Sequence, residues 1–275
     1  MQELLDIAIS AAEQASEKII EVYHTDFSKT VQTKSDNSPL TIADIAANEI
    51  ITNLLRKTGM PILSEEGALD APRDTPYCWI VDPLDGTKGF INKSDEFVVS
   101  IALVKDGRPV IGVLAVPVKG TIFFASKGKG AFKQESNKRT RIHVSDRISE
   151  LVWIGSKLHP HPEEEKLREK NSHLIKTVIS VSSALKGTMM AEGIADVYYR
   201  FGLTSEWDVC AMHCIVEEAG GIFRELDGGE KLYNRSASPT GSASRTGGAS
   251  RTGRANNHLN EKGFYIVNRA ENIWV

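Results

Sequence analysis

The spacing of apolar residues predicts two amphipathic helices at the start of the chain, before any strand. In residues 2–24 apolar side chains recur every three or four positions, which is the period of a helix with one buried face. A second pattern of this kind follows Thr41 and ends near Gly59. We therefore expect two helices that each cover one side of a core.

Between residues 62 and 125 the pattern changes to short β-rich runs separated by turns. We expect strands at 62–63, 79–81, 97–104, 110–116 and 121–125. Asp106-Gly107 lies between two of these runs and is typical of a hairpin. Part of this sheet is therefore predicted to be an antiparallel meander.

After about residue 145 the predicted strands and helices alternate. We expect strands at 152–154, 178–180, 196–199 and 264–267, and helices at 163–171, 183–192 and 207–219. The chain is therefore predicted to be an α/β protein with two halves, 1–145 and 146–275. Residues 236–254 contain Ala-Ser-Arg-Thr-Gly twice and cannot form a core, so we interpret them as a mobile loop.

Composition and charge exclude several classes of protein. The 275 residues are 41% hydrophobic and 25% charged, which excludes disorder of the whole chain. A formal net charge of −3 gives no bulk attraction to nucleic acid. The first nine residues carry Glu3 and Asp6 and no basic residue, and no run approaches ~18 apolar residues, so we expect neither a signal sequence nor a membrane span. We expect a cytoplasmic protein, and leave open a peripheral contact with the inner membrane and a homodimer.

The three cysteines are too few for a disulfide framework. Cys210 and Cys214 are four residues apart with His213 between them, a spacing that is compatible with a metal clip. No second ligand cluster accompanies them in the sequence, so we interpret them as buried thiols on one helix face.

The most informative stretch is the sequence Asp-Pro-Leu-Asp-Gly-Thr at 82–87, which follows an apolar strand. We expect Pro83 to end that strand and Thr87 to begin a helix. Two carboxylates at one strand end repel each other unless a cation lies between them, and Mg²⁺ prefers oxygen ligands of this kind. The N–H groups after Asp85 can hold a phosphate beside the cation. The alternative is an ordinary strand-turn-helix with an aspartate cap.

Further acidic residues occur where other elements begin or end. Glu65 and Glu66 follow the strand at 62–63, and Asp208 lies near the start of the helix at 207–219. Each alone could be solvated or favoured by a helix dipole. If they converge with the two aspartates of 82–87, they form a site in which metal ions activate water and stabilise a leaving oxygen.

These motifs resemble the Mg²⁺-dependent, lithium-sensitive phosphatases of the inositol monophosphatase superfamily. The matches are Glu-Glu at 65–66, Asp-Pro-Leu-Asp-Gly-Thr at 82–87 and Trp-Asp at 207–208, which occur in the family's order. The resemblance covers nearly the whole chain except residues 236–254. It implies alternating α/β/α/β/α layers with the active site between two halves.

The resemblance also implies roles for particular residues. The implied ligands of two or three Mg²⁺ ions are Glu65, Asp82, Asp85, Asp208 and the carbonyl of Leu84. Thr87 and Glu65 are implied to orient the attacking water, and Asp44 to be an additional acid near that water and a third metal. Such a mechanism needs positioning and charge neutralisation rather than a covalent intermediate. Inhibition by Li⁺ is expected on the same ground.

Other segments resemble the branch of the superfamily that hydrolyses 3'(2'),5'-bisphosphonucleosides. They are residues 34–41, 87–88, 182–186, 198–202 and 204–208. The implied substrate contacts are Asp85, Gly86, Thr87, Ser183, Lys186, Arg200 and Asp208. A retained second phosphate needs a cation, which Lys186 or Arg200 can supply, although both could be solvated surface cations. We therefore expect adenosine 3'(2'),5'-bisphosphate, or its sulfated analogue, as the substrate and AMP as the product of the bisphosphate.

Several alternatives stay open on the sequence alone. Gly89 and Val181 stand where that branch usually has Glu and Gly, which weakens the substrate assignment and leaves inositol monophosphatase or another phosphomonoesterase as alternatives. A haloacid-dehalogenase-type phosphatase has its second aspartate two positions after the nucleophile, whereas Asp82 and Asp85 are three apart. A non-catalytic phosphate sensor would have lost a metal carboxylate or Thr87, and all are present.

Overall fold

The structure is a computed structural model, and it describes residues 1–26, 31–33, 39–67, 72–236, 259–260 and 262–275. The loop predicted at 236–254 lies outside these residues except for Ser236. The α-helices are α1 (Gln2–Tyr23), α2 (Ile42–Leu55), α3 (Thr87–Ile91), α4 (Pro162–Lys170), α5 (Leu185–Ala191) and α6 (Glu206–Glu218). In the described residues no helix is long and apolar enough to cross a membrane.

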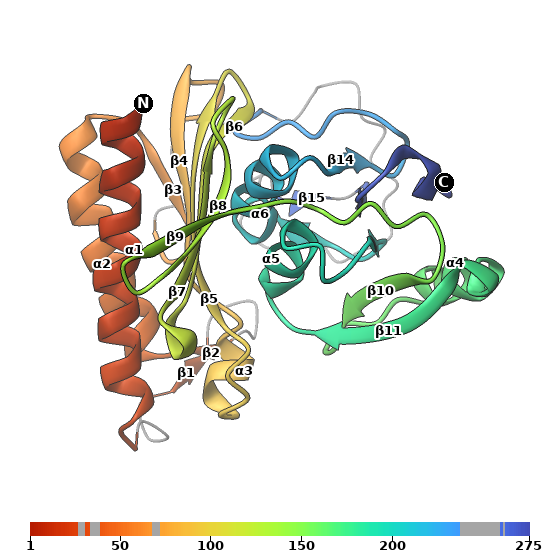
Figure 1. Cartoon of the computed structure of the whole chain (residues 1–275). Helices are drawn as coiled ribbons and strands as arrows, with labels where there is room; N and C mark the ends of the chain where they lie inside the picture. The colour runs from red at the N-terminus through yellow and green to blue at the C-terminus, as the bar shows by residue number, and fades with distance from the viewer. Residues whose placement is uncertain (27–30, 34–38, 68–71, 237–258, 261) are drawn as a thin grey trace.

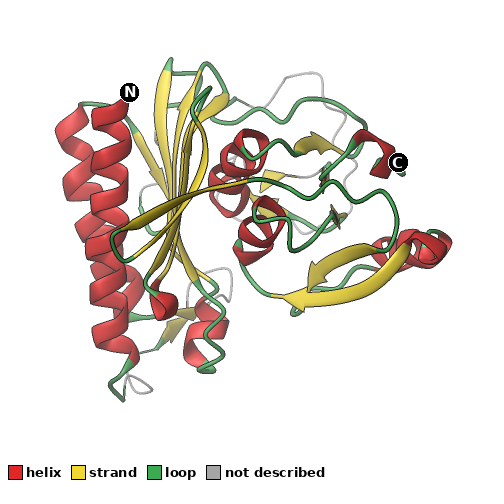
Figure 2. Cartoon of the chain, viewed as in Figure 1, coloured by secondary structure: helices red, strands yellow, loops and turns green. Residues whose placement is uncertain are grey.

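Helices and sheets alternate in layers across the molecule (Figure 1). The pair α1 and α2 covers one face of a seven-stranded sheet, and α5 and α6 cover the other face. A five-stranded sheet follows, and α4 lies beyond it with the C-terminus. The predicted order of layers, α/β/α/β/α, is therefore confirmed, and Figure 2 shows the same arrangement by type of element.

The seven-stranded sheet has its strands in chain order. They are β3 (Ile62–Ser64), β4 (Tyr77–Asp85), β5 (Val98–Lys105), β6 (Arg108–Val116), β7 (Thr121–Ser126), β8 (Gly130–Glu135) and β9 (Lys138–Ile142). Only the pair β3 and β4 is parallel among these neighbours. Asp106 and Gly107 join β5 to β6 with φ of 49° and 83°, as a tight hairpin turn requires, so the predicted meander is confirmed.

The five-stranded sheet combines parallel and antiparallel pairs in the order β11-β10-β12-β16-β14. Its strands are β10 (Leu151–Ser156), β11 (Ile175–Val181), β12 (Val197–Arg200), β14 (Ile222–Glu225) and β16 (Phe264–Val267). Two short ladders complete the strands: β1 (Gln32–Thr33) with β2 (Pro39–Leu40), and β13 (Thr204–Ser205) with β15 (Leu259–Asn260).

The central strands contain long apolar runs, such as 78–81 of β4 and 110–116 of β6, because both faces of the large sheet are covered. On β4, Trp79 packs with the residues of α1 and α2, whereas its neighbour Ile80 packs with those of α6. The cluster that contains Ile80 also contains Ile154 of the smaller sheet. The two sheets thus share this one hydrophobic cluster. The division into halves at residue 145 stays a prediction.

The cysteines lie in this interior. Cys78, Cys210 and Cys214 are free thiols and are buried, with Cys210 and Cys214 on α6. Burial raises the pKa of the Cys78 thiol to about 11, so it stays protonated. The interpretation of the pair as buried thiols on one helix is confirmed.

Candidate active site

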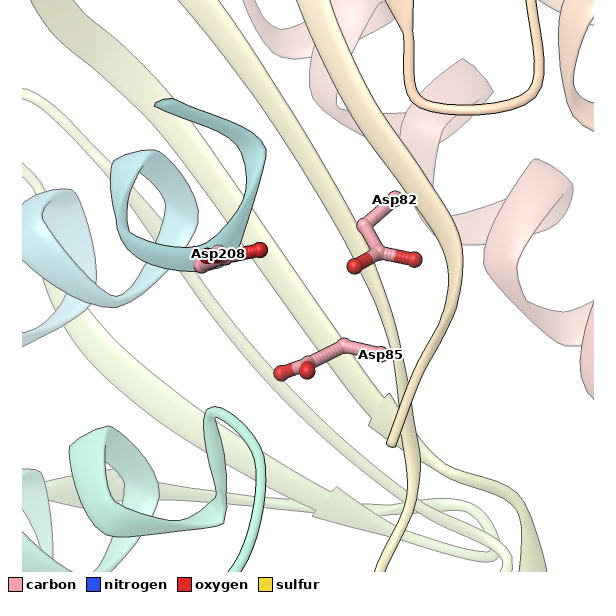
Figure 3. A group of neighbouring side chains, drawn as sticks. All are labelled: Asp82, Asp85 and Asp208. Atoms are coloured by element: carbon pink, nitrogen blue, oxygen red, sulfur yellow. The ribbon is translucent and has the colours of Figure 1, made fainter. Parts of the chain in front are cut away.

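Three aspartates from two distant parts of the chain meet between β4 and α6. Figure 3 shows Asp82 and Asp85 on β4 and Asp208 at the start of α6, with their carboxylates directed into a common space. One carboxylate oxygen from each lies within 4.8 Å of the others. Asp85 and Asp208 are 208 − 85 = 123 positions apart in the sequence, and the fold brings them into one acidic cluster.

An irregularity in β4 places the first two aspartates. The expectation that Pro83 ends the strand was wrong, because β4 continues to Asp85 and its register with β5 shifts between Asp82 and Asp85. A proline can occupy such a bulge because it has no N–H to donate to the ladder. The N–H of Leu84 instead donates to Asp82 Oδ1 at 3.0 Å, which fixes that carboxylate beside the bulge.

The start of α6 places the third aspartate. Asp208 is the third residue of the helix, and its Oδ2 accepts a hydrogen bond of 2.7 Å from the N–H of Ser205 in a capping box. Its other oxygen remains available to the cluster. Helix capping and site formation therefore use the same side chain.

Burial and mutual repulsion raise the pKa of all three carboxyls. Burial is the main cause at Asp82, whose pKa is raised well above its usual range, with further contributions from Glu65, Asp85 and Asp208. The pKa of Asp85 rises to about 6, although Lys186 opposes the shift, and that of Asp208 rises to about 8. The positive charge near the cluster is therefore too small to balance its carboxylates. Their oxygen-only donor set fits a hard divalent cation such as Mg²⁺.

Two further predicted ligands border the same space. Glu65 follows β3, its N–H donates to Val81 O of β4 at 3.1 Å, and its carboxylate contributes to the raised pKa of Asp82. The buried Leu84 lies in the wall of the same cavity. All five residues that the sequence predicts as metal ligands thus line one cavity, and three of them form the carboxylate cluster.

Thr87 and Asp44 form a pair behind the cluster. Thr87 Oγ1 lies 3.1 Å from Asp44 Oδ1 and 3.2 Å from the carbonyl oxygen of Leu84. Asp44 is 1% exposed, and its Oδ2 accepts hydrogen bonds from the N–H and the hydroxyl of Thr41, which caps α2. Asp44 is therefore not part of the cavity wall, and it is connected to the cavity by its contact with Thr87, which is.

The cavity beside the cluster has a volume of about 510 Å³ and a basic side. Lys186 is 5% exposed, and its Nζ donates to the carbonyl oxygens of Ser183 at 2.7 Å and Val181 at 3.3 Å. Burial lowers the pKa of Lys186 to about 8, while Asp85 opposes the shift. Ser183 lines the cavity with a φ of 58°, a left-handed conformation that is uncommon outside glycine.

Arg200 lies at the same side but is held by other groups. Its Nη1 donates to the carbonyl of His159 at 2.6 Å and to Glu164 Oε1 at 3.3 Å, and the residue is 8% exposed. Arg200 is thus a buried cation that already has a counter-ion, Glu164. Lys186, with one donor beyond its two carbonyl bonds, is the less neutralised cation.

Sequence reasoning missed several residues of the cavity wall. They are Ser156, Leu158, His159, Leu203 and Leu259. Leu158 and Leu203 are 44% and 62% exposed, which is unusual for leucine but provides an apolar surface beside the charged groups. None lies in a motif, because each reaches the cavity only when strands and loops distant in the sequence come together.

Comparison with known proteins identifies the family of the chain. The model of the inositol monophosphatase family matches residues 1–262, so the chain belongs to the inositol monophosphatase family. It is 39% identical over 230 residues to the 3'(2'),5'-bisphosphate nucleotidase CysQ of Escherichia coli K12, which covers 82% of this chain and 92% of that protein. The family resemblance predicted from the motifs is confirmed.

Solved structures agree with this assignment. CysQ from Bacteroides thetaiotaomicron, described as a bacterial member of the inositol monophosphatase family, superposes with a TM-score of 0.78 at 34% identity, covering 98% of each chain. An inositol monophosphatase from Anabaena has a TM-score of 0.72 at 26% identity, covering 97% of this chain and 91% of that one. The predicted fold class is thereby confirmed.

Proposed function

We propose that the chain is a Mg²⁺-dependent phosphatase that converts adenosine 3'(2'),5'-bisphosphate to AMP and phosphate. The observation that carries this proposal is one cavity with a carboxylate cluster on one side and buried cations on the other. A substrate with two phosphates fits such a cavity, because the reacting phosphate can lie at the metals and the retained one at the cations. The likeness to the CysQ nucleotidases supports the choice of substrate.

The acidic cluster is the proposed binding site for two or three Mg²⁺ ions. Asp82, Asp85, Asp208, Glu65 and the carbonyl of Leu84 would hold them. When bound, the metal ions neutralise the phosphate oxygens, activate water and stabilise the leaving oxygen. Their charge would also relieve the repulsion that raises the pKa of the cluster.

Thr87 is proposed to orient the attacking water together with Glu65. Both neighbours of the Thr87 hydroxyl, Asp44 Oδ1 and Leu84 O, are acceptors, so its hydrogen must go to one of them. The hydroxyl oxygen can then only accept from a third partner. A water in the cavity that donates to Thr87 and to the Glu65 carboxylate has its lone pair free for attack on phosphorus.

The basic side is proposed to bind the retained phosphate. Lys186 has a third N–H that is not used by its two carbonyl partners, and Ser183 adds a hydroxyl beside it. Arg200, oriented by His159 and Glu164, can contribute a second cation. Gly86 lines the cavity and can contribute its backbone N–H, while its missing Cβ leaves room for the carbonyl of Glu96. Inhibition by Li⁺, a cytoplasmic location and a homodimer stay predictions.

A substrate panel tests this proposal. Adenosine 3',5'-bisphosphate, its sulfated analogue, inositol 1-phosphate and fructose 1,6-bisphosphate are each assayed for phosphate release with Mg²⁺, with and without Li⁺. We expect the highest kcat/KM with the two adenosine compounds and no release in EDTA. A higher kcat/KM for inositol 1-phosphate would favour an inositol monophosphatase. Binding of the bisphosphate without phosphate release would favour a non-catalytic sensor.

A further inference from the structure

The segment that carries Ser183 and Lys186 is tied to the opposite side of the cavity by two carboxylates. Asp85 Oδ2 accepts a hydrogen bond of 2.5 Å from the N–H of Ala184, and Glu96 Oε2 accepts one of 3.1 Å from the N–H of Ser182. Asp85 is the last residue of β4, and Glu96 lies in the loop before β5. Both donors lie between β11 and α5. The two bonds therefore connect the two sides of the proposed substrate site.

Glu96 also holds the end of β10. Its Oε1 accepts a hydrogen bond of 2.8 Å from Lys157 Nζ, and the N–H of Lys157 donates to Val181 O at 3.3 Å. The Glu96 side chain is 20% exposed and the Lys157 side chain 49%. An ion pair this exposed contributes little by itself, so the bond to the buried Ser182 is the more important contact of Glu96.

The backbone of Glu96 is fixed against the turn that follows Asp85. A Cβ on Gly86 would lie 2.6 Å from the Glu96 carbonyl oxygen, and a Cβ on Gly89 would lie 2.7 Å from it. Only glycine permits this close packing. Glu96 thus has its backbone against the phosphate-binding turn of the first half and its side chain on the Ser182 segment of the second.

The position of Lys186 depends on the same segment. Lys186 Nζ donates to Ser183 O, and Ser183 has a left-handed backbone that its neighbours must hold in place. The hydrogen bonds to Ser182 and Ala184 enclose this residue on both sides. Loss of the Ser182 bond would release one side of the strained residue and move the cation attached to it.

We propose that Glu96 is a positioning residue for recognition of the retained phosphate, acting through its hydrogen bond to the N–H of Ser182. Glu96 is not part of the cavity wall, so it acts through Ser183 and Lys186 rather than on the substrate. This inference rests on the proposed function. It adds a residue outside the motifs that determines specificity for a substrate with two phosphates.

The test compares Glu96→Ala, which removes both hydrogen bonds, with Glu96→Gln, which retains an acceptor for Ser182. Glu150→Ala is the matched control, because Glu150 forms an exposed ion pair with Lys176 at the other end of the same two strands. Each protein is assayed for kcat and KM on adenosine 3',5'-bisphosphate. The Kd of AMP, which keeps only the retained phosphate, is measured by calorimetry with Mg²⁺. A thermal melt confirms that each variant is folded.

We expect Glu96→Ala to raise both KM and the Kd of AMP about tenfold while kcat changes less than about threefold. Glu96→Gln and Glu150→Ala should stay within about threefold of the unmodified protein on all three quantities. The inference is overturned if Glu96→Ala leaves the Kd of AMP unchanged, or if Glu96→Gln is as impaired as Glu96→Ala. Failure of the unmodified protein to hydrolyse the bisphosphate would instead reject the proposed function.

Discussion

Asp44 and Asp208 each combine a structural and a functional task, because both are the third residue of a helix capping box and both belong to the site. Substituting either would disturb a helix start together with the chemistry. Asp85 caps no helix, and its contacts are the N–H of Ala184 and the other members of the cluster. It is therefore the cleaner residue for testing the metal site.

Asp85→Asn should lower kcat about 1,000-fold or more and remove measurable Mg²⁺ binding. The amide has the shape of the carboxylate but cannot neutralise a shared cation. Calorimetric titration with Mg²⁺ and a phosphate-release assay check both effects. The exposed Asp6 of α1 provides the control Asp6→Asn, which should behave as the unmodified protein. Near-normal Mg²⁺-dependent turnover of Asp85→Asn would exclude the assigned role.

Lys186→Ala should raise KM for adenosine 3',5'-bisphosphate about tenfold more than KM for adenosine 3'-phosphate. The reason is that the proposed contact of Lys186 is with the phosphate that only the first compound retains. Steady-state kinetics on both compounds give the ratio, and Lys176→Ala, which removes an exposed lysine of β11, serves as the control. An equal increase for the two compounds would place Lys186 elsewhere in the mechanism.

The residues of the site could be predicted only where they lie in motifs. Asp82, Asp85 and Asp208 could be named because acids at element ends are visible in the sequence. Leu158 and His159 could not, because they become part of the cavity when β10 turns toward α4, and no local pattern encodes that approach. The same holds for Glu96, which is one of several acids in a polar loop until the structure shows its partner.

At the scale of elements, the turn from β4 into α3 depends on backbone conformation more than on side chains. Gly86 has a φ of 102° and leaves no room for a Cβ beside Glu96. Gly59, at the end of the second predicted helix, also has a positive φ, of 70°, but has nothing within 4 Å of a Cβ position. Comparing the two glycines therefore separates the cost of a positive φ from the cost of a clash between a Cβ and the neighbouring backbone.

Gly86→Ala should lower the free energy of unfolding by roughly 3 kcal/mol, because strain and a backbone clash add together. Gly59→Ala should cost about 1 kcal/mol, from strain alone. Urea denaturation followed by fluorescence measures both. Gly86→Ala should also lower kcat, since Thr87 moves with the turn. Equal losses of stability in the two variants would show that the close packing on Glu96 is unimportant.

Helices were more predictable than strands in this chain. The two N-terminal helices have a clear apolar stripe, whereas β8, β9 and β14 were not predicted. In β9 the first four residues, including Lys138 and Arg139, are exposed, so the strand carries no apolar signal and is defined by pairing with β8. The prediction from Pro83 failed because the residue lies in a bulge of β4, which can be recognised only from the pairing with β5.

At the scale of the whole molecule, the small net charge conceals a separation of charge across one cavity. Carboxylates from the large sheet and α6 face cations at α5 and β12. Without metal, the folded protein keeps these carboxylates close together at a cost in stability. Metal binding and folding should therefore be linked.

Metal-free protein should become less stable as the pH rises between about 4 and 8. The pKa values of Asp85 and Asp208, about 6 and about 8 when folded, exceed the unfolded value of 3.8, so the folded state binds more protons in this window. Thermal melts in EDTA at about pH 5 and pH 8 measure the trend, and Mg²⁺ should raise Tm most at the higher pH. A rise of Tm with Mg²⁺ that is the same at both pH values would contradict the repulsive cluster.

The central claim is that the metal side of the cavity removes one particular phosphate while the basic side retains the other. Incubation of adenosine 3',5'-bisphosphate with the protein and Mg²⁺, followed by phosphorus NMR of the products, tests it most directly. We expect inorganic phosphate and adenosine 5'-phosphate as the products, and no reaction when Mg²⁺ is chelated. Adenosine 3'-phosphate as the product, or turnover that persists in EDTA, would contradict it.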